Sequence, residues 1–226
     1  MSKPRFSVVM PAAGIGKRVG SEIPKQYLTI LDKAIIEYSL APFLAHPDIN
    51  QVIVSIAEND QWFHRLSVAK HPKLNIVKGG KERVDSVLSA LKSLPDTDYV
   101  LVHDAARPCI QTSDIDKLLE HALQYDSGAM LAYRVRDTMK RSSTEQQVKH
   151  TVDRDNLWHA LTPQMFKNQQ LISAITGIEA QHLITDEASA IELSGGAVSI
   201  IEGRSDNIKV TQAEDLLLAE FYLSKI

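Results

Sequence analysis

The sequence predicts an α/β fold in which a twisted, mostly parallel sheet is covered by helices on both faces. Short β-branched runs alternate along most of the chain with longer segments whose apolar residues recur at helical spacing. The short runs are apolar almost throughout, which is typical of strands buried on both faces of a parallel sheet. A chain of 226 residues suits one domain, covering residues 1–226, that buries a large core without disulfides or structural metals.

The expected strands are short runs rich in β-branched side chains. They are Phe6–Met10, Gln51–Ala57, Leu74–Val77, Tyr99–His103, Ala129–Tyr133 and Val198–Glu202.

Helices are expected where apolar residues form a stripe every three or four positions. One stripe consists of Val84, Val87, Leu88, Leu91 and Leu94, and another of Ile115, Leu118, Leu119, Ala122 and Leu123. Ser113 is the expected N-cap of the second helix. A third helix is expected to begin at "TQAED", where Thr211 and Glu214 have the spacing of a capping box, and to run to the C-terminus.

One segment, from Arg136 to about Trp158, departs from this alternation. It is polar, with two short β-like pieces around "SSTEQQ", and predicts a hairpin projecting from the sheet. An isolated two-stranded ribbon is only marginally stable in water. We therefore expect this β-arm to pack against a second subunit in a homodimer; the alternative is a mobile loop.

Composition excludes several classes of partner. The formal net charge is −3, so no general basic field attracts nucleic acid or anionic lipid. No apolar span approaches the roughly 18 residues of a membrane helix. Cys109 is the single cysteine; its apolar neighbours favour a packed thiol over a nucleophile. A lone cysteine fits a reducing compartment, and the cytoplasm is the expected location.

The loop after the first expected strand, "PAAGIGKRVGSEIPKQY", combines glycines with Lys17, Arg18 and Lys25 and has no acidic residue before Glu22. A P-loop is excluded, because Arg18 follows the Gly-Lys pair where Ser or Thr is required and Pro11 stands at the first glycine position. A dinucleotide fingerprint requires a shorter glycine spacing. A merely solvated turn would leave the cations without a purpose.

A nucleoside triphosphate site is the interpretation that remains. Gly14 and Gly16 allow the backbone to approach phosphates closely, and Arg18 and Lys25 supply positive charge. Attack at the α-phosphorus gathers negative charge on the equatorial oxygens and on the departing pyrophosphate, and fixed cations stabilise that charge. The loop therefore favours nucleotidyl transfer over hydride chemistry.

Two further clusters follow expected strands, where ligands of open α/β sheets lie. Asp104 ends the strand Tyr99–His103 and suits Mg²⁺, although a turn aspartate is equally common. Asp206 could complete the metal site, with Lys209 beside it. The loop "GGKERVDS" offers amides to a base or ribose; a plain turn is the alternative. The spacing of the histidines indicates neither a metal site nor a catalytic relay, so His103, His150 and His159 are interpreted as structural.

Nine motifs together give the chain a clear resemblance over nearly its full length. They are "PAAGIGKRVG", "PKQYL", "GGKERVDSV", "VHDAARP", "VRDTMK", "HTVDR", "LWHALTPQ", "TDEASA" and "EGRSDNIKVT". In this order they resemble the 2-C-methyl-D-erythritol 4-phosphate cytidylyltransferase family. The resemblance implies a Rossmann-like nucleotidyltransferase fold that transfers CMP from CTP to a sugar-alcohol phosphate in the non-mevalonate isoprenoid pathway.

The resemblance also implies roles for individual residues. The catalytic set falls on Arg18, Lys25, Arg154 and Lys209. The nucleotide-binding set falls on Pro11, Ala12, Ala13, Gly14, Gly16, Gly80, Arg83, Ser86, Asp104 and Ala105. The acceptor-binding set falls on Thr138, Arg154, Lys209 and Arg107, and Mg²⁺ falls to Asp104 and Asp206. The family's arm embraces a neighbouring subunit, which implies an active site shared across a homodimer. Lys81 departs from the pattern, since an acidic residue is expected there.

The implied reaction is a direct in-line displacement in which the acceptor phosphate attacks the α-phosphorus of CTP. A ribitol 5-phosphate cytidylyltransferase would share the nucleotide loops, and only the acceptor-side motifs "VRDTMK" and "HTVDR" favour methylerythritol phosphate. A non-catalytic CTP sensor would not require Arg18, Lys25, Asp104 and Lys209 together. An NAD-dependent oxidoreductase is a remoter alternative.

Overall fold

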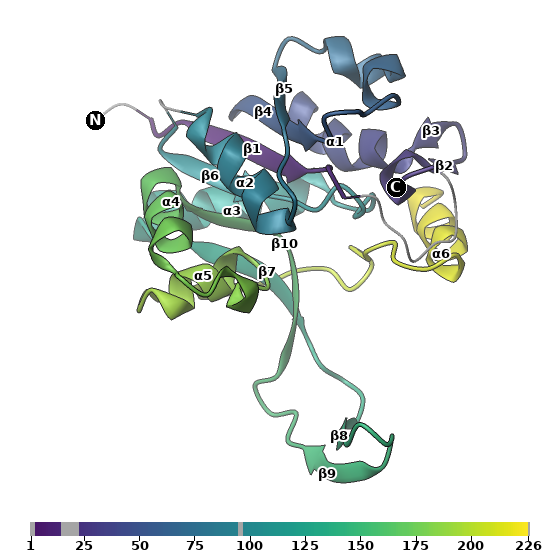
Figure 1. Ribbon diagram of the computed structural model, residues 1–226, viewed down its shortest axis with the longest axis vertical. Coiled ribbons are helices and arrows are strands. Elements are labelled where there is room, and N and C mark those ends of the chain that lie inside the picture. The colour runs from purple at the N-terminus through teal and green to yellow at the C-terminus, as the bar shows by residue number, and fades with distance from the viewer. Residues whose placement is uncertain (1–2, 15–22, 95–96, 226) are drawn as a thin grey trace.

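The computed structural model describes residues 3–14, 23–94 and 97–225 and is built around a seven-stranded sheet of order β11-β7-β10-β6-β1-β4-β5 (Figure 1). The strands are β1 (Phe6–Pro11), β4 (Ile49–Ile56), β5 (Leu74–Lys78), β6 (Tyr99–Val102), β7 (Ala129–Arg134), β10 (Trp158–Lys167) and β11 (Ser199–Glu202). All neighbouring strands pair in parallel except β10, which runs antiparallel to both β6 and β7. The predicted fold class is confirmed.

The six expected strands are present with small shifts at their ends, and β10 was not among them. Its sequence, "WHALTPQMFK", contains a proline, which normally argues against a central strand. The structure accommodates Pro163 where the pairing with β7 shifts between Ala160 and Gln164, so no regular ladder bond is lost there.

Helices cover both faces. They are α1 (Ile35–Ala45), α2 (Arg83–Lys92), α3 (Thr112–Tyr125), α4 (Asn168–Gly177), α5 (Glu187–Leu193) and α6 (Glu214–Leu223). Because strand side chains alternate between faces, Val8 and Met10 pack with α1 and α3, whereas Val9 packs with α2, α4 and α5. These two core clusters lie on opposite sides of the sheet, and α6 packs in a third, smaller cluster with Ile30, Ile35 and Cys109.

Short elements complete the chain. They are the pair β2 (Thr29–Ile30) and β3 (Lys33–Ala34), and the 3₁₀ turns η2 (Lys25–Tyr27), η3 (Phe63–Arg65), η4 (Ser67–Lys70) and η5 (Gln181–Leu183). None of the described helices is long and apolar enough to cross a bilayer.

Two predicted helix caps were wrong. Ser113 lies inside the first turn of α3, which is preceded by Gln111; the Asp114 carboxylate accepts the Gln111 N–H at 3.2 Å. At α6, Thr211 donates its N–H and its hydroxyl to Asp215 rather than pairing with Glu214. In both cases a carboxylate in the first turn accepts from backbone amides of the residues just before the helix.

The predicted hairpin is confirmed as β8 (Met139–Ser142) paired with β9 (Val148–Val152). Figure 1 shows it at the end of a long extension below β7 and β10. Between Arg136 and Asn156 every residue is exposed except Ser143 and Val152, which are half-buried. The arm therefore contributes no core to its own subunit.

Candidate active site

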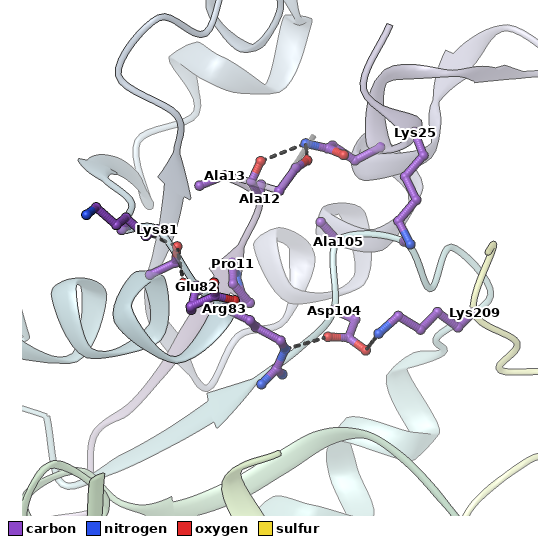
Figure 2. Close-up of a pocket in the computed structure, with 15 residues that line it drawn as sticks. Pro11, Ala12, Ala13, Lys25, Lys81, Glu82, Arg83, Asp104, Ala105 and Lys209 are labelled. Carbon is purple, nitrogen blue, oxygen red and sulfur yellow. Dashed lines mark hydrogen bonds and ion pairs between the residues drawn. The ribbon is translucent and has the colours of Figure 1, made fainter. Parts of the chain in front are cut away.

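A cavity of about 170 Å³ lies where the loops after β1, β5 and β6 meet, at the carboxyl ends of the parallel strands (Figure 2). Its lining comes from five separate segments of the chain. The residues are Pro11, Ala12, Ala13, Gly14, Lys25, Gln26, Gly80, Lys81, Glu82, Arg83, Ser86, Asp104, Ala105, Ala106 and Lys209.

The first loop is fixed by backbone bonds and by a side chain that sequence reasoning missed. Ala12 N–H donates to Ser55 O at 2.8 Å. The buried Gln26 amide donates to Ala12 O at 2.6 Å and to Gly14 O at 3.2 Å. Gln26 thereby holds residues 12–14, at the start of the loop, against η2 and next to Lys25. Its position in "PKQYL", within a motif of the resemblance, was the available signal.

The Gly79–Gly80 pair is required by close packing. A Cβ on Gly79 would lie 2.4 Å from the Ala13 Cβ, and one on Gly80 would lie 2.1 Å from the Asp85 Cβ. Gly80 N–H also donates to Ser86 Oγ at 3.1 Å, at the start of α2. The glycines let the loop after β5 lie directly against the loop after β1, so the two form adjacent walls of the cavity.

Positive charge converges on the cavity around one carboxylate. Asp104 contacts Lys209 at 2.8 Å, Arg83 at 3.2 Å and Arg107 at 3.6 Å. Burial alone would raise the pKa of Asp104, but Arg83, Lys209 and Arg107 outweigh it and hold that pKa far below its usual range. Figure 2 shows Lys25 and Lys209 pointing into the same space beside Asp104; Lys25 also donates to Val210 O at 3.2 Å.

Arg83 is held by carboxylates from two other segments of the chain, Asp104 and Glu187. Its guanidinium makes two hydrogen bonds to Glu187 at the start of α5, of 2.6 and 3.0 Å. Burial opposes its charge, yet Glu187 and Asp104 raise its pKa above the ordinary value. Glu187 lies in the "TDEASA" motif, and its pairing across 104 residues could not be inferred from spacing.

Behind Asp104, a buried hydrogen-bond chain fixes the turn that carries it. Asp104 N–H donates to Thr162 Oγ1 at 3.1 Å. His103 Nε2 lies 3.2 Å from Arg107 O, a carbonyl that can only accept. His103 is therefore protonated at Nε2, and its Nδ1 accepts from the Thr162 hydroxyl at 3.0 Å. The prediction of a structural role for His103 fits this arrangement.

The hydrogen bonds of His103 require its neutral form, so the stability of the folded protein should depend on pH. Burial lowers the pKa of His103 to about 4, more than Asp104 raises it. An unfolded chain takes up the proton near pH 6.5, so the free energy of unfolding falls as the pH drops from there toward 4. Between pH 7 and pH 5 we expect a loss of about 2 kcal/mol, measured by urea denaturation. His103→Asn should remove this part of the slope; an unchanged slope would contradict the assignment.

The structure brings together most of the sequence-predicted site residues. Those that line the cavity are Pro11, Ala12, Ala13, Gly14, Lys25, Gly80, Arg83, Ser86, Asp104, Ala105 and Lys209. Gly16 and Arg18 lie outside the described residues. Arg107, buried behind Asp104, lines a neighbouring cavity of about 270 Å³ together with Lys209. Thr138 and Arg154 belong to the exposed arm and line neither cavity.

The carboxylates offer one plausible metal ligand. Within residues 3–14, 23–94 and 97–225, no group of three or more His, Cys, Asp or Glu is placed to hold a metal ion. Mg²⁺ commonly takes only one or two carboxylates and completes its shell with phosphates and water, so Asp104 at the cavity wall fits such an ion. Asp206 is engaged by Arg204 at 2.7 Å and does not line the cavity.

Comparison with known proteins identifies the family. The family model for 2-C-methyl-D-erythritol 4-phosphate cytidylyltransferase (IspD) matches residues 6–225. The chain belongs to this family. It is 56% identical to the enzyme of that name from Pseudoalteromonas atlantica, over 97% of this chain and 96% of the relative. It is 53% identical to the one from Vibrio vulnificus strain YJ016, over 96% of this chain and 94% of the relative.

Solved structures of the family share the fold. A crystal structure of 4-diphosphocytidyl-2C-methyl-D-erythritol synthase superposes with a TM-score of 0.85 at 32% identity, covering 98% of this chain and all of the other. The Francisella tularensis member of the family gives a TM-score of 0.82 at 33% identity, covering 96% and 99% of the two chains. The Rossmann-like nucleotidyltransferase fold implied by the sequence is thereby confirmed.

Proposed function

We propose that this protein transfers CMP from CTP to 2-C-methyl-D-erythritol 4-phosphate, giving 4-diphosphocytidyl-2-C-methyl-D-erythritol and pyrophosphate in isoprenoid precursor synthesis. The observation that carries the proposal is the meeting of Lys25 and Lys209 at a cavity walled by the backbone of two glycine-bearing loops, in a chain of this family. Cations at such a wall suit a triphosphate whose charge increases in the transition state.

The chemistry requires positioning and charge stabilisation. The acceptor phosphate is already ionised near neutral pH and can attack the α-phosphorus of CTP directly, with pyrophosphate leaving from the opposite side. Lys25, with Arg18, stabilises the charge that develops on the phosphate oxygens. The backbone of Ala12–Gly14 and the loop Gly80–Ser86 hold the base and ribose. Lys209 and Arg107 are the residues proposed to bind the acceptor.

A bound Mg²⁺ would supply further neutralisation of the triphosphate, and Asp104 is the residue proposed to hold it. Each Asp104 oxygen contacts a cation, and the remaining lone pairs of the carboxylate would be available to such an ion. Asp206, which the resemblance assigns to the same ion, would have to leave its ion pair with Arg204 in order to bind the ion.

We propose further that the protein acts as a homodimer. The support is that Thr138 and Arg154, the expected acceptor-binding residues of the arm, line neither of the two cavities that contain Lys209 in their own subunit. The cavity that Arg154 does line lies at the base of the arm. Thr138 and Arg154 can serve a site only if the arm reaches a neighbour. A single buried cysteine, Cys109, agrees with the cytoplasm as the expected location.

The deciding experiment is pyrophosphate release from CTP with methylerythritol phosphate or ribitol 5-phosphate as acceptor. We expect turnover with the first and at most a trace with the second. The ribitol and sensor alternatives are not favoured, since relatives more than half identical over nearly the whole chain bear the methylerythritol phosphate cytidylyltransferase name. Release with ribitol phosphate alone would replace the proposed acceptor, and no release with either would favour the sensor.

Arg154→Ala tests the role of the arm. Loss of a guanidinium that binds a phosphate should raise the KM for methylerythritol phosphate about tenfold or more, with the KM for CTP nearly unchanged. Steady-state kinetics with each substrate varied in turn measures the split. Equal effects on both KM values would count against an acceptor-side role.

A further inference from the structure

The base of the arm is closed by two successive cross-strand side-chain pairs. In the antiparallel register of β7 and β10, Arg134 stands opposite Trp158 and Tyr133 stands opposite His159. The Arg134 guanidinium carbon lies 4.4 Å from the centre of the Trp158 ring, within cation–π distance. The Tyr133 and His159 rings stack with centroids 4.5 Å apart. We call these four side chains the clasp.

Arg134 and Trp158 are the last register pair of β7 and β10 before the arm leaves the sheet. Beyond it, Val135 N–H donates to Leu157 O at 3.0 Å and Arg154 donates to Arg136 O at 2.5 Å. The two chain segments then separate and pair again only at β8 and β9 (Figure 1). Since nearly every side chain from Arg136 to Asn156 is exposed, packing within the subunit cannot set the direction of the arm.

The two pairs lie on opposite faces of the ribbon, because consecutive strand residues alternate. A ribbon pinned on both faces resists rotation about its own axis as well as bending. The Tyr133–His159 face also lines the cavity that contains Arg107 and Lys209. The base of the arm is thus anchored against the acceptor side of its own subunit's site.

We infer that Arg134 and Trp158 are positioning residues that fix the exit direction of the arm, and through it the place of Thr138 and Arg154 in a neighbouring site. The inference rests on the proposed function, in which the arm completes the acceptor site of a partner. Arg134 lines a small cavity at the base of the arm together with Arg154. Its contact with Trp158 is on the opposite strand, so we expect its effect on the acceptor to pass through the geometry of the arm.

The test uses Arg134→Met, which keeps an unbranched side chain of similar length and removes the cation. The parent protein carries Trp62→Phe, so that Trp158 is its single tryptophan. Acrylamide quenching of Trp158 fluorescence reports the contact itself. Initial rates report the two KM values. Arg134→Lys keeps a cation over the ring, and Arg141→Met removes a cation from β8, away from the clasp.

We expect Arg134→Met to increase Trp158 quenching and to raise the KM for methylerythritol phosphate about tenfold, with kcat and the KM for CTP within about twofold of the parent. Arg134→Lys should recover most of the change, and Arg141→Met should cause none. Parent-like quenching and acceptor KM in Arg134→Met would overturn the inference, as would equal increases in both KM values.

Arg154→Ala, measured in parallel, separates the two proposals. If Arg154→Ala raises the acceptor KM and Arg134→Met does not, the clasp inference fails and the proposed function stands. If neither variant affects the acceptor KM, the arm has no role at the acceptor site, and both the shared site and the clasp inference are overturned.

Discussion

Lys25→Ala is expected to lower kcat by about 100- to 1,000-fold, equivalent to about 3–4 kcal/mol of lost transition-state stabilisation. Lys25 begins η2 beside the buried Gln26, and its ammonium points into the cavity that Lys209 and Asp104 also line (Figure 2). Because the charge on the phosphate oxygens grows during the reaction, a fixed cation there lowers the barrier more than it tightens CTP binding.

Single-turnover measurement of CMP transfer at saturating CTP is the appropriate assay, since it separates chemistry from product release. Lys70→Ala serves as the matched control: Lys70 ends η4, is exposed and does not line the cavity. Lys25→Ala protein with a turnover near that of the wild type would refute the role assigned to the loop.

Asp104→Asn is expected to lower the free energy of unfolding by about 3 kcal/mol, because breaking a buried ion pair leaves its partners uncompensated. Arg107 and Lys209 would lose their carboxylate, while Arg83 would keep Glu187. Urea denaturation at neutral pH, where the Asp104 carboxylate is ionised in the wild type, measures the change.

Asp48→Asn is the control for this stability effect. Asp48 pairs with Lys3 at 2.5 Å on the surface, and an exposed ion pair contributes only about 0–1 kcal/mol. If Asp104→Asn lost no more stability than Asp48→Asn, the three cations would not stabilise the Asp104 carboxylate, and the electrostatic account of the cavity would be wrong.

The fold was largely predictable because its strands and two of its helices carry strong local patterns. The apolar run of β1 predicts a strand, and the apolar stripe of α2 predicts a helix, without any knowledge of tertiary contacts. β10 was missed because Pro163 interrupts its pattern, and a local rule cannot foresee that the pairing shifts at that point. The carboxylate that accepts from Thr211 is Asp215, one residue after the predicted Glu214, because both acidic side chains stand at a suitable spacing in the sequence.

The site was predictable in its loops and less so in its contacts. Gly14, Gly80 and Lys25 could be predicted from the local sequence, because they lie in loops that follow expected strands. The partners of Asp104 come from α2, from its own turn and from the segment before α6. Contacts between segments so far apart in the chain produce no regular spacing from which they could be predicted. The same is true of the Arg83–Glu187 pair.

The reversed direction of β10 has a consequence for how this scaffold tolerates change. With β7 ending and β10 beginning at the same rim, an excursion of the chain can start and finish there without crossing the sheet or altering any strand order. The connection between Arg136 and Leu157 is therefore a natural graft point. Arms of other lengths or from other relatives should be exchangeable at this junction while the underlying fold is preserved.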